Sequence, residues 1–312
     1  MTNNDKKNSD DGRAQADRIS VLEKKILDLE SDLVSKEQDL LRYKTELTKA
    51  NKALDKLIFQ VHQELRVAAQ IQRVLVPTEY PNIQGIEFST KFIPGTQKGG
   101  DYFDIFEHDD CLKFGILVSC SSGYTMSALF LSVLLKMAGQ MEARRGAEPH
   151  LVLKKMVAEL LPSMNAGKDR ASLFYGVIDR RTFEMQYCQV GNNVVLAVDG
   201  ETGKMTALKS EAPPIIKGYK NELSCHSVTL NSCDRLIIVS EGVVRTLNPS
   251  GEPFGLDRLS QAVLKAPKTG VHEMRNEILF QLEKYAESNE FPEDITIVVT
   301  EVKERILKLA RV

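Results

Sequence analysis

The sequence is poor in aromatic residues: it contains no tryptophan, and aromatic residues make up only 6% of the chain. The formal net charge is −2, so there is no excess of basic residues either. Proteins that bind nucleic acid need a positive surface, often with aromatic side chains on which bases stack. We therefore expect no nucleic-acid partner.

Long apolar segments are also missing. No run approaches the roughly 18 consecutive apolar residues of a membrane-spanning helix, and residues 1–12 are polar and acidic, unlike a signal peptide. The expected location is the cytoplasm, with no membrane span. The five cysteines include no Cys-x-x-Cys pair. Because several lie in apolar, strand-like segments, the sequence predicts reduced, buried thiols rather than disulfides or zinc ligands.

Glycine and proline are absent from residues 13–76, and a heptad repeat runs through this segment. Its a positions are all apolar, whereas Lys36 and Glu64 interrupt the d positions. The pattern predicts a coiled coil, and Ile and Leu at a with Leu at d fit a dimer without excluding a trimer. A long helix folded back on its own domain is the alternative. The expected dimer contacts are the a positions Ile19, Ile26, Leu33, Leu40, Leu47, Leu54 and Val61, after which the repeat continues to Ala68.

Pro77 and Pro81 end the predicted helix, because proline lacks the backbone N–H that a helix needs. Beyond them, turn residues separate many short segments with strand or helix periodicity. The expected organisation is a disordered tail (1–17), a coiled coil with a linker helix (18–76), a globular domain (77–304) and a C-terminal tail (305–312).

The globular segment contains clustered strand patterns with helices in pairs, which favours an α+β domain of two sheets flanked by helices. Asp199-Gly200, followed by Thr202-Gly203, is typical of a hairpin turn. Strands are expected at 86–92, 112–120, 173–178, 184–189, 194–199, 224–230, 235–240 and 294–302, and helices at 126–144, 149–164, 255–265 and 270–287.

Three short segments contain carboxylates that could carry chemistry. In the first, Gly99-Gly100 precedes Asp101, and Asp104 follows after two aromatic residues. Glycines let the backbone turn closely around an ion, and a carboxylate just after such a turn can hold a hard cation. An ordinary loop that opens a strand is the alternative for this motif. The other two segments place Glu241 and the pair Glu293-Asp294 at the ends of strand-like runs.

In order and context these segments resemble bacterial PPM-type phosphatases of the RsbU/SpoIIE kind, over about residues 65–302. That family reads Ala-x-x-Ile-Gln-x-x-Leu-x-Pro, Gly-Gly-Asp-Tyr-x-Asp, Asp-Val-x-Gly-His-Gly, Ala-Gly-His-Asn, Thr-Asp-Gly and Asp-Asp-Ile-Thr. The corresponding segments here are 69–77, 99–104, 118–123 (Val-Ser-Cys-Ser-Ser-Gly), 190–193 (Val-Gly-Asn-Asn), 240–242 (Ser-Glu-Gly) and 293–296 (Glu-Asp-Ile-Thr).

The resemblance implies a PPM β-sandwich with flanking helices, and a metal-dependent phosphoserine/phosphothreonine phosphatase of sigma-factor partner switching. Two Mn²⁺ or Mg²⁺ ions would be held at Asp101, Asp294, the position of Glu241 and, as the bridging ligand, the position of Val118. Valine cannot bind a metal, and Glu241 is longer than aspartate by one C–C bond, about 1.5 Å. The implied ligands are therefore Asp101, Glu241 and Asp294, with Asp104 and Glu293 as auxiliaries and weak metal binding, if any.

Without the family, Val118 is simply a core residue, since it shares the parity of Leu112, Phe114 and Ile116 on a predicted strand. Two functions then compete. The favoured one is a phosphatase-fold protein with impaired or lost catalysis, which binds a phosphoprotein or a partner resembling an anti-sigma-factor antagonist. The other is an active Mn/Mg-dependent phosphatase. A coiled-coil scaffold is a third reading, but it explains only residues 19–71.

Overall fold

The computed structural model describes residues 3–75, 80–96, 100–109, 111–122, 133, 147–167, 169–208 and 212–303. The chain divides into two compact units, residues 1–64 and 65–312. The division lies inside the segment expected to be a linker helix.

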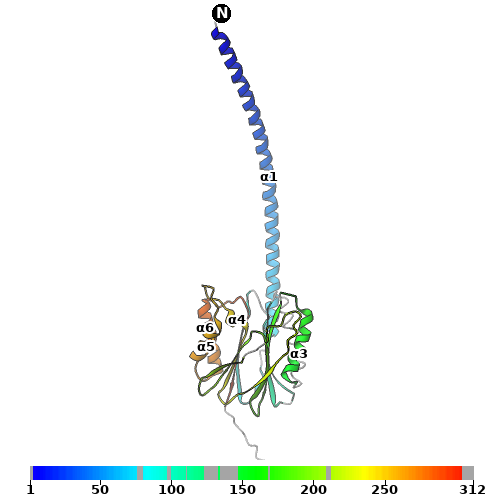
Figure 1. Ribbon diagram of the computed structural model, residues 1–312, viewed down its shortest axis with the longest axis vertical. Helices are drawn as coiled ribbons and strands as arrows, with labels where there is room; N and C mark the ends of the chain where they lie inside the picture. The colour runs from blue at the N-terminus through cyan, green and yellow to red at the C-terminus, as the bar shows by residue number, and fades with distance from the viewer. Residues whose placement is uncertain are drawn as a thin grey trace, which may run out of the picture. The chain divides into compact units, whose positions relative to one another are not determined.

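The N-terminal segment is one long helix, α1 (Asn3–Leu75), which ends two residues before Pro77 as predicted (Figure 1). The helix begins at Asn3, inside the segment 1–17 that was expected to be a disordered tail. Gly12 is the only strong helix breaker between Asn3 and Leu75, and one glycine costs a helix only about 1 kcal/mol. Among the described residues, no helix combines the length and apolar character that a membrane span requires.

The second unit is a sandwich of two antiparallel five-stranded sheets (Figure 1). The first sheet has the order β1-β10-β9-β6-β7, and the second has the order β2-β3-β4-β5-β8. The strands are β1 (Ile86–Ile93), β2 (Tyr102–Glu107), β3 (Lys113–Ser122), β4 (Arg170–Asp179), β5 (Glu184–Val190), β6 (Val194–Val198), β7 (Met205–Leu208), β8 (Cys225–Thr229), β9 (Arg235–Val239) and β10 (Ile295–Val302).

Helices cover the outer faces of both sheets, α5 and α6 on the first and α3 on the second (Figure 1). This architecture confirms the predicted α+β sandwich flanked by helices. The helical segments after α1 are α3 (Pro149–Leu160), the short 3₁₀ helix η1 (Leu161–Ser163), α4 (Glu241–Arg245), α5 (Gly255–Lys265) and α6 (Val271–Ala286).

The core has three apolar layers. The central layer lies between the sheets and contains Phe103, Val118 and Val298, each no more than 1% exposed. The other two layers lie beneath the helices, one under α3 and one under α5 and α6. Val118 is therefore the core residue that its strand periodicity predicts.

Most predicted elements are present, but β2, β7 and α4 were not predicted. The predicted helix at 126–144 lies almost entirely outside the described residues. The hairpin prediction is confirmed: the carboxylate of Asp199 accepts hydrogen bonds from the N–H groups of Glu201 (3.0 Å) and Thr202 (2.7 Å), between β6 and β7.

The prediction that all cysteines are reduced and buried was wrong. Cys188 and Cys225 form a disulfide, because the pairing of β5 with β8 places them directly opposite each other with Cα atoms 4.5 Å apart. Cys111 and Cys233 are free but exposed, and Cys120 is free and buried. The sequence could not reveal the pairing, because it depends on the register of two strands far apart in the chain.

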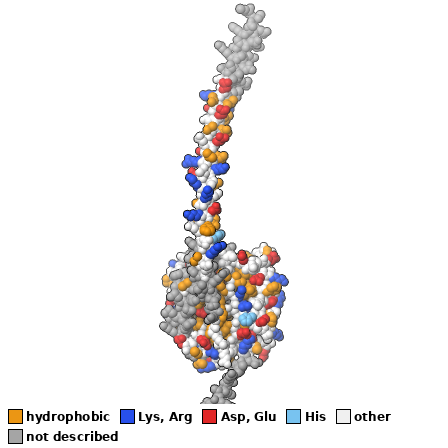
Figure 2. Space-filling model, turned by 180° about the vertical axis from the view of Figure 1, so that it is seen from behind, with side chains coloured by type: hydrophobic (Ala, Val, Ile, Leu, Met, Phe, Trp, Pro, Cys, Tyr) orange, Lys and Arg blue, Asp and Glu red, His pale blue; other side chains and the backbone are white. Residues whose placement is uncertain are grey.

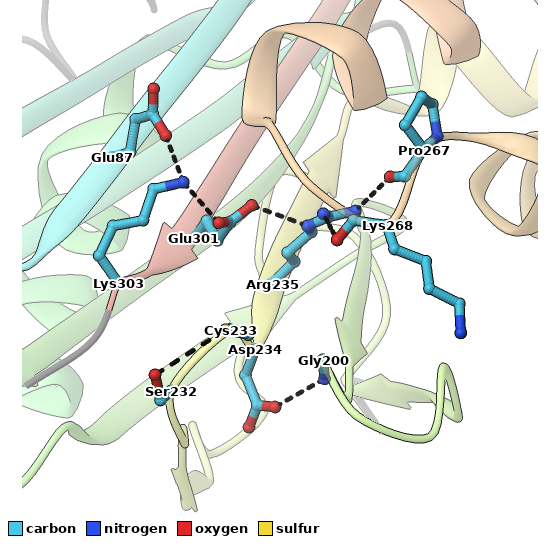
Figure 3. Close-up of polar contacts among 10 residues, drawn as sticks. All are labelled: Glu87, Gly200, Ser232, Cys233, Asp234, Arg235, Pro267, Lys268, Glu301 and Lys303. Atoms are coloured by element: carbon cyan, nitrogen blue, oxygen red, sulfur yellow. Dashed lines mark hydrogen bonds and ion pairs between the residues drawn. The ribbon is translucent and has the colours of Figure 1, made fainter.

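A buried ion pair joins the central strands of the first sheet (Figure 3). The Nε of Arg235 in β9 donates to Glu301 in β10 at 2.9 Å, and the two side chains are only 5% and 6% exposed. The guanidinium also donates to the carbonyl oxygens of Pro267 and Lys268. Lys303 donates to Glu301 as well, so the pair is the centre of a network.

We predict that Glu301→Gln lowers the free energy of unfolding by about 3–5 kcal/mol, because it leaves a buried guanidinium without a counter-charge. Glu252→Gln is the matched control, since Glu252 pairs with Arg258 at 3.7 Å and both side chains are exposed. Its cost should not exceed about 1 kcal/mol. Urea unfolding followed by circular dichroism measures both values, and equal costs would contradict the prediction.

Candidate functional site

The predicted site residues gather at one end of the sandwich. Asp294 lies just before β10, and Glu241 follows β9 on the neighbouring strand of the same sheet. Asp101 lies just before β2 in the other sheet. The structure therefore brings together carboxylates from both sheets, although more than 190 residues separate Asp101 from Asp294 in the sequence.

Asp294 is the link between the two sheets at this end. Its Oδ1 accepts the N–H of Gly95 at 2.6 Å, and its Oδ2 accepts the N–H groups of Gly100 and Asp101 at 2.7 and 2.9 Å. The residue is only 4% exposed. Both carboxylate oxygens therefore hold the backbone of the loop that leads into β2.

Asp101 is buried beside Asp294 and is 6% exposed. Its Oδ2 accepts a hydrogen bond from the hydroxyl of Thr296 at 2.8 Å. Burial, and then the charge of Asp294, raise the pKa of Asp101 well above its usual value, and the hydrogen bond from Thr296 only partly opposes the shift. In the absence of a cation, the two aspartates disfavour each other's ionisation.

Cys120, not Val118, is the β3 residue beside Asp101. β2 and β3 pair Phe103 with Val118, and the pairing reaches Gly100, whose carbonyl oxygen accepts the N–H of Ser121 at 3.1 Å. This register places Cys120 opposite Asp101 and Val118 one step deeper in the core.

The thiol of Cys120 donates to Oδ1 of Asn193 at 2.9 Å. Burial, followed by the charge of Asp101, raises the pKa of this thiol well above its usual value. Asn193 in turn donates to the carbonyl oxygen of Val118 at 3.3 Å. The neutral thiol is thus fixed between Asp101 and an amide.

Glu241 and Glu293 are both close to a guanidinium. Glu241 is the first residue of α4, and Arg245 lies one turn later, with Nη1 3.1 Å from Oε1 of Glu241. The Nε of Arg245 lies 4.0 Å from Oε2 of Glu293. A Cβ atom at Gly242 would collide with the carbonyl oxygen of Asp294, so glycine is what lets α4 pack against the start of β10.

Asp104 is not part of the cluster around Asp101. It accepts hydrogen bonds from the hydroxyl of Tyr102 and from the N–H of Ile105, both at 2.9 Å. Tyr102 belongs to the apolar layer under α3, which lies on the opposite face of β2 from Phe103. Across the described part of the chain, no three His, Cys, Asp or Glu side chains are grouped as metal ligands would be.

Comparison with known proteins identifies the sandwich. Residues 113–303, more than half of the chain, match the family Stage II sporulation protein E (SpoIIE). The chain belongs to the SpoIIE family. The family resemblance inferred from the order of the motifs is thereby confirmed.

Among related proteins, protein IcfG of Synechocystis sp. is 25% identical over 64% of this chain and 35% of its own length. Phosphoserine phosphatase RsbU of Bacillus subtilis is 21% identical over 62% of this chain and 56% of its own length. The chain thus spans about a third of the first relative and just over half of the second. Among solved structures, the SiaA-PP2C domain of Pseudomonas aeruginosa superposes with a TM-score of 0.66 at 20% identity, over 78% of this chain and 97% of that domain. This last likeness shows a PP2C phosphatase fold.

Sequence reasoning missed two residues of the site. Cys120 shares the strand parity of Val118, so the same period-two pattern that placed Val118 in the core could have placed Cys120 on the same face, two residues nearer the end. Arg245 is four residues after Glu241, the spacing of an ion pair on a helix. That signal was hidden because α4 has only five residues.

We predict that Asp294→Asn destabilises the protein by about 2–3 kcal/mol even in EDTA, because the new amide group faces backbone N–H donors and leaves one or more of them unpaired. Glu293→Gln is the neighbouring control; its side chain is partly exposed and should cost less than about 0.5 kcal/mol. Urea unfolding gives both values. A metal-free Asp294→Asn protein as stable as the wild type would show that Asp294 has no structural role.

Proposed function

We propose that this chain is a signalling protein of the phosphatase fold that binds a phosphoprotein or switch partner, and that its two-metal centre is too altered for normal catalysis. Membership of the SpoIIE family supports the signalling role. The observation that carries the proposal is the thiol of Cys120 beside Asp101. We assign this position, and not that of Val118, to the bridging aspartate that the family resemblance implies.

The ligand chemistry supports loss of the metals. Mg²⁺ and Mn²⁺ prefer carboxylate and other oxygen ligands, whereas a thiol suits softer ions. Both oxygens of Asp294 already accept backbone hydrogen bonds, which leaves fewer of the carboxylate's lone pairs for an ion. The donors present therefore fit a pair of divalent ions poorly.

The charge of Arg245 supports the same proposal. Its guanidinium lies near Glu241 and Glu293, the two remaining carboxylates at this end of the sandwich. A fixed positive charge competes with a divalent ion for the same carboxylates, although pairs this exposed bind one another only weakly. A metal ion that binds Glu241 would therefore have to compete with its ion pair to Arg245.

An active Mn/Mg-dependent phosphatase that regulates a partner-switching pathway is the second candidate. One observation favours it. Burial and the charge of Asp294 raise the pKa of Asp101, and a cation between the two carboxylates would offset the repulsion between them. At most one ion, weakly held, is consistent with these two residues. A measurement of metal binding and activity separates the candidates.

We predict that Cys120→Asp combined with Glu241→Asp raises Mn²⁺ affinity at least about tenfold and creates phosphatase activity, because it adds one carboxylate ligand and returns a second to the length of an aspartate, on metals that share them. Calorimetry measures the affinity, and hydrolysis of p-nitrophenyl phosphate measures the activity. Wild type should take up at most one Mn²⁺, weakly.

Val118→Asp is the control for position. It buries a carboxylate between the two sheets and should destabilise the fold without improving Mn²⁺ binding. Two tight Mn²⁺ sites in the wild-type protein, with activity that the double substitution does not increase, would refute the altered-site proposal and leave the active phosphatase.

We also propose that α1 forms a homodimeric coiled coil. The described a positions between Ile26 and Val61 are 51–70% exposed in the single chain, and Figure 2 shows apolar side chains at the surface along the helix. Apolar stripes of this length are usually covered by a partner. A second copy of the same heptad repeat is the occupant that its periodicity fits.

We predict that wild type sediments as a dimer at micromolar concentration and that Leu40→Asp/Leu47→Asp sediments as a monomer, because charge at two successive a positions opposes the seam. Val34→Asp/Leu41→Asp makes the same change one residue along the helix, on side chains that are 52% and 68% exposed. This control should remain a dimer. A monomeric wild type would contradict the proposal.

A further inference from the structure

The long helix α1 carries a second apolar column besides the a positions of its heptad repeat. The b positions Leu27, Val34 and Leu41 are apolar in three successive heptads, and their side chains are 66%, 52% and 68% exposed. A b position lies about 100° around the helix from an a position, which places it outside the a/d seam of a coiled coil. The proposed dimer therefore leaves this b column exposed.

The apolar b column is confined to one stretch of α1. In the next three heptads the b positions are Thr48, Asp55 and His62, which are all polar. From Leu27 to Leu41 the helix rises about 21 Å, or roughly four turns. Single exposed apolar residues are ordinary on a protein surface, but three in line at heptad spacing form a strip that a second helix can cover.

Two glutamates lie between the b column and the a positions. Glu30 and Glu37 are e positions, and both are exposed. On a helix surface, a side chain interacts with neighbours three and four residues away. For these two glutamates all such neighbours are apolar, namely Ile26, Leu27, Leu33, Val34, Leu40 and Leu41. At these spacings α1 itself therefore offers neither carboxylate a basic partner.

Glu46 shows the contrast on the same helix. Its Oε1 lies 3.3 Å from Nε of Arg42, which is one turn earlier. Dimerisation supplies such a partner to only one of the two glutamates. In a parallel coiled coil an e residue faces the g residue five positions earlier on the second helix, so Glu30 would face Lys25 of the second copy, whereas Glu37 would face Asp32. The surface beside the b column thus stays acidic around Glu37.

Further copies of α1 fit the b column poorly. If two b columns packed side by side in the same direction, Glu30 and Glu37 would each meet the same residue of the other copy. In the opposite direction, with Leu27 beside Leu41, Glu30 of one copy would come close to Glu37 of the other. Like charges that are brought together oppose association in both arrangements. The occupant that the charges favour is a basic helix of a different protein.

We propose that the b column, together with Glu30 and Glu37, is a docking surface for an amphipathic helix of another protein. The helix that fits has apolar residues at heptad spacing, which cover Leu27, Val34 and Leu41, and has lysines or arginines beside them, which pair with the two glutamates. The inference rests on the proposed coiled coil, since that dimer leaves the b column exposed. It is independent of the carboxylate cluster in the second unit.

The probe is a fluorescein-labelled synthetic helix of three heptads with one apolar stripe flanked by lysines. A matched peptide has glutamate in place of every lysine. Fluorescence anisotropy with the full-length protein measures both dissociation constants. The lysine peptide should bind at least about tenfold more tightly than the glutamate peptide, and its binding should weaken as salt is raised, because the glutamates are exposed.

Two variants of the docking surface separate its apolar and charged parts. Val34→Ser/Leu41→Ser should weaken binding of the lysine peptide at least about tenfold, because two apolar contacts are lost. Glu30→Gln/Glu37→Gln should weaken it about threefold and reduce its salt dependence, because exposed ion pairs contribute modestly. Both variants should still sediment as dimers, since every a and d position is unchanged.

Matched controls make the same changes elsewhere on α1. Ile58→Ser/Phe59→Ser removes two apolar side chains that are 46% and 63% exposed. Glu46→Gln/Asp55→Asn removes two exposed negative charges beyond the end of the b column. Both controls should bind the lysine peptide like the wild type.

Equal affinity of the wild type for the two peptides, or undiminished binding by Val34→Ser/Leu41→Ser, would overturn the proposal. A lysine peptide that splits the dimer would lie in the a/d seam, and a tetramer that depends on Val34 and Leu41 would assign the b column to further copies; either result also overturns it. A monomeric wild type that binds the lysine peptide through these two residues would contradict the coiled coil and uphold the docking surface, so the two proposals fail separately.

Discussion

The arrangement at the functional end of the sandwich depends on one carboxylate, that of Asp294. It lies at the start of β10 in one sheet and binds three backbone N–H groups on the segment that leads into β2 of the other. A charged acceptor satisfies several buried amides at once and is stronger than neutral partners would be. The position of Asp101 follows directly, since its own N–H is one of the three. A residue that is expected to hold a metal ion therefore also holds backbone on both sides of residues 97–99.

The charges of the first sheet are largely balanced within the protein. β9 begins at Arg235, whose buried pair with Glu301 closes one end, and it is followed by Glu241, which pairs with Arg245 at the other. Asp101 and Asp294 are the exception, because they lie beside each other without such a pair, and burial, followed by the charge of Asp294, raises the pKa of Asp101. A cation bound at this pair would relieve the unfavourable interaction between the two carboxylates.

The sequence predicted the sandwich and the long helix, and it predicted that Asp101, Glu241 and Asp294 lie at the ends of strands of the sandwich. Motif order and strand periodicity can be recognised in the sequence alone. The sequence did not predict strand β2, because strand prediction relied on alternation between apolar and polar residues. β2 is buried on both faces, with Phe103 in the central layer and Tyr102 under α3, so it shows no alternation. The assignment of the lost ligand to Val118 stays a prediction, and the register of β3 offers Cys120 as a second candidate. Residues two apart on a strand share a face, and only the register with β2 shows that Cys120 is the one beside Asp101.

Loss of the metals and phosphate binding at a different surface are physically compatible. A phosphoryl group presented to the buried carboxylates of Asp101 and Asp294 without divalent ions would be repelled by them, and Arg245 beside Glu241 would offset this repulsion only in part. A partner that must be recognised in its phosphorylated form then requires donors elsewhere.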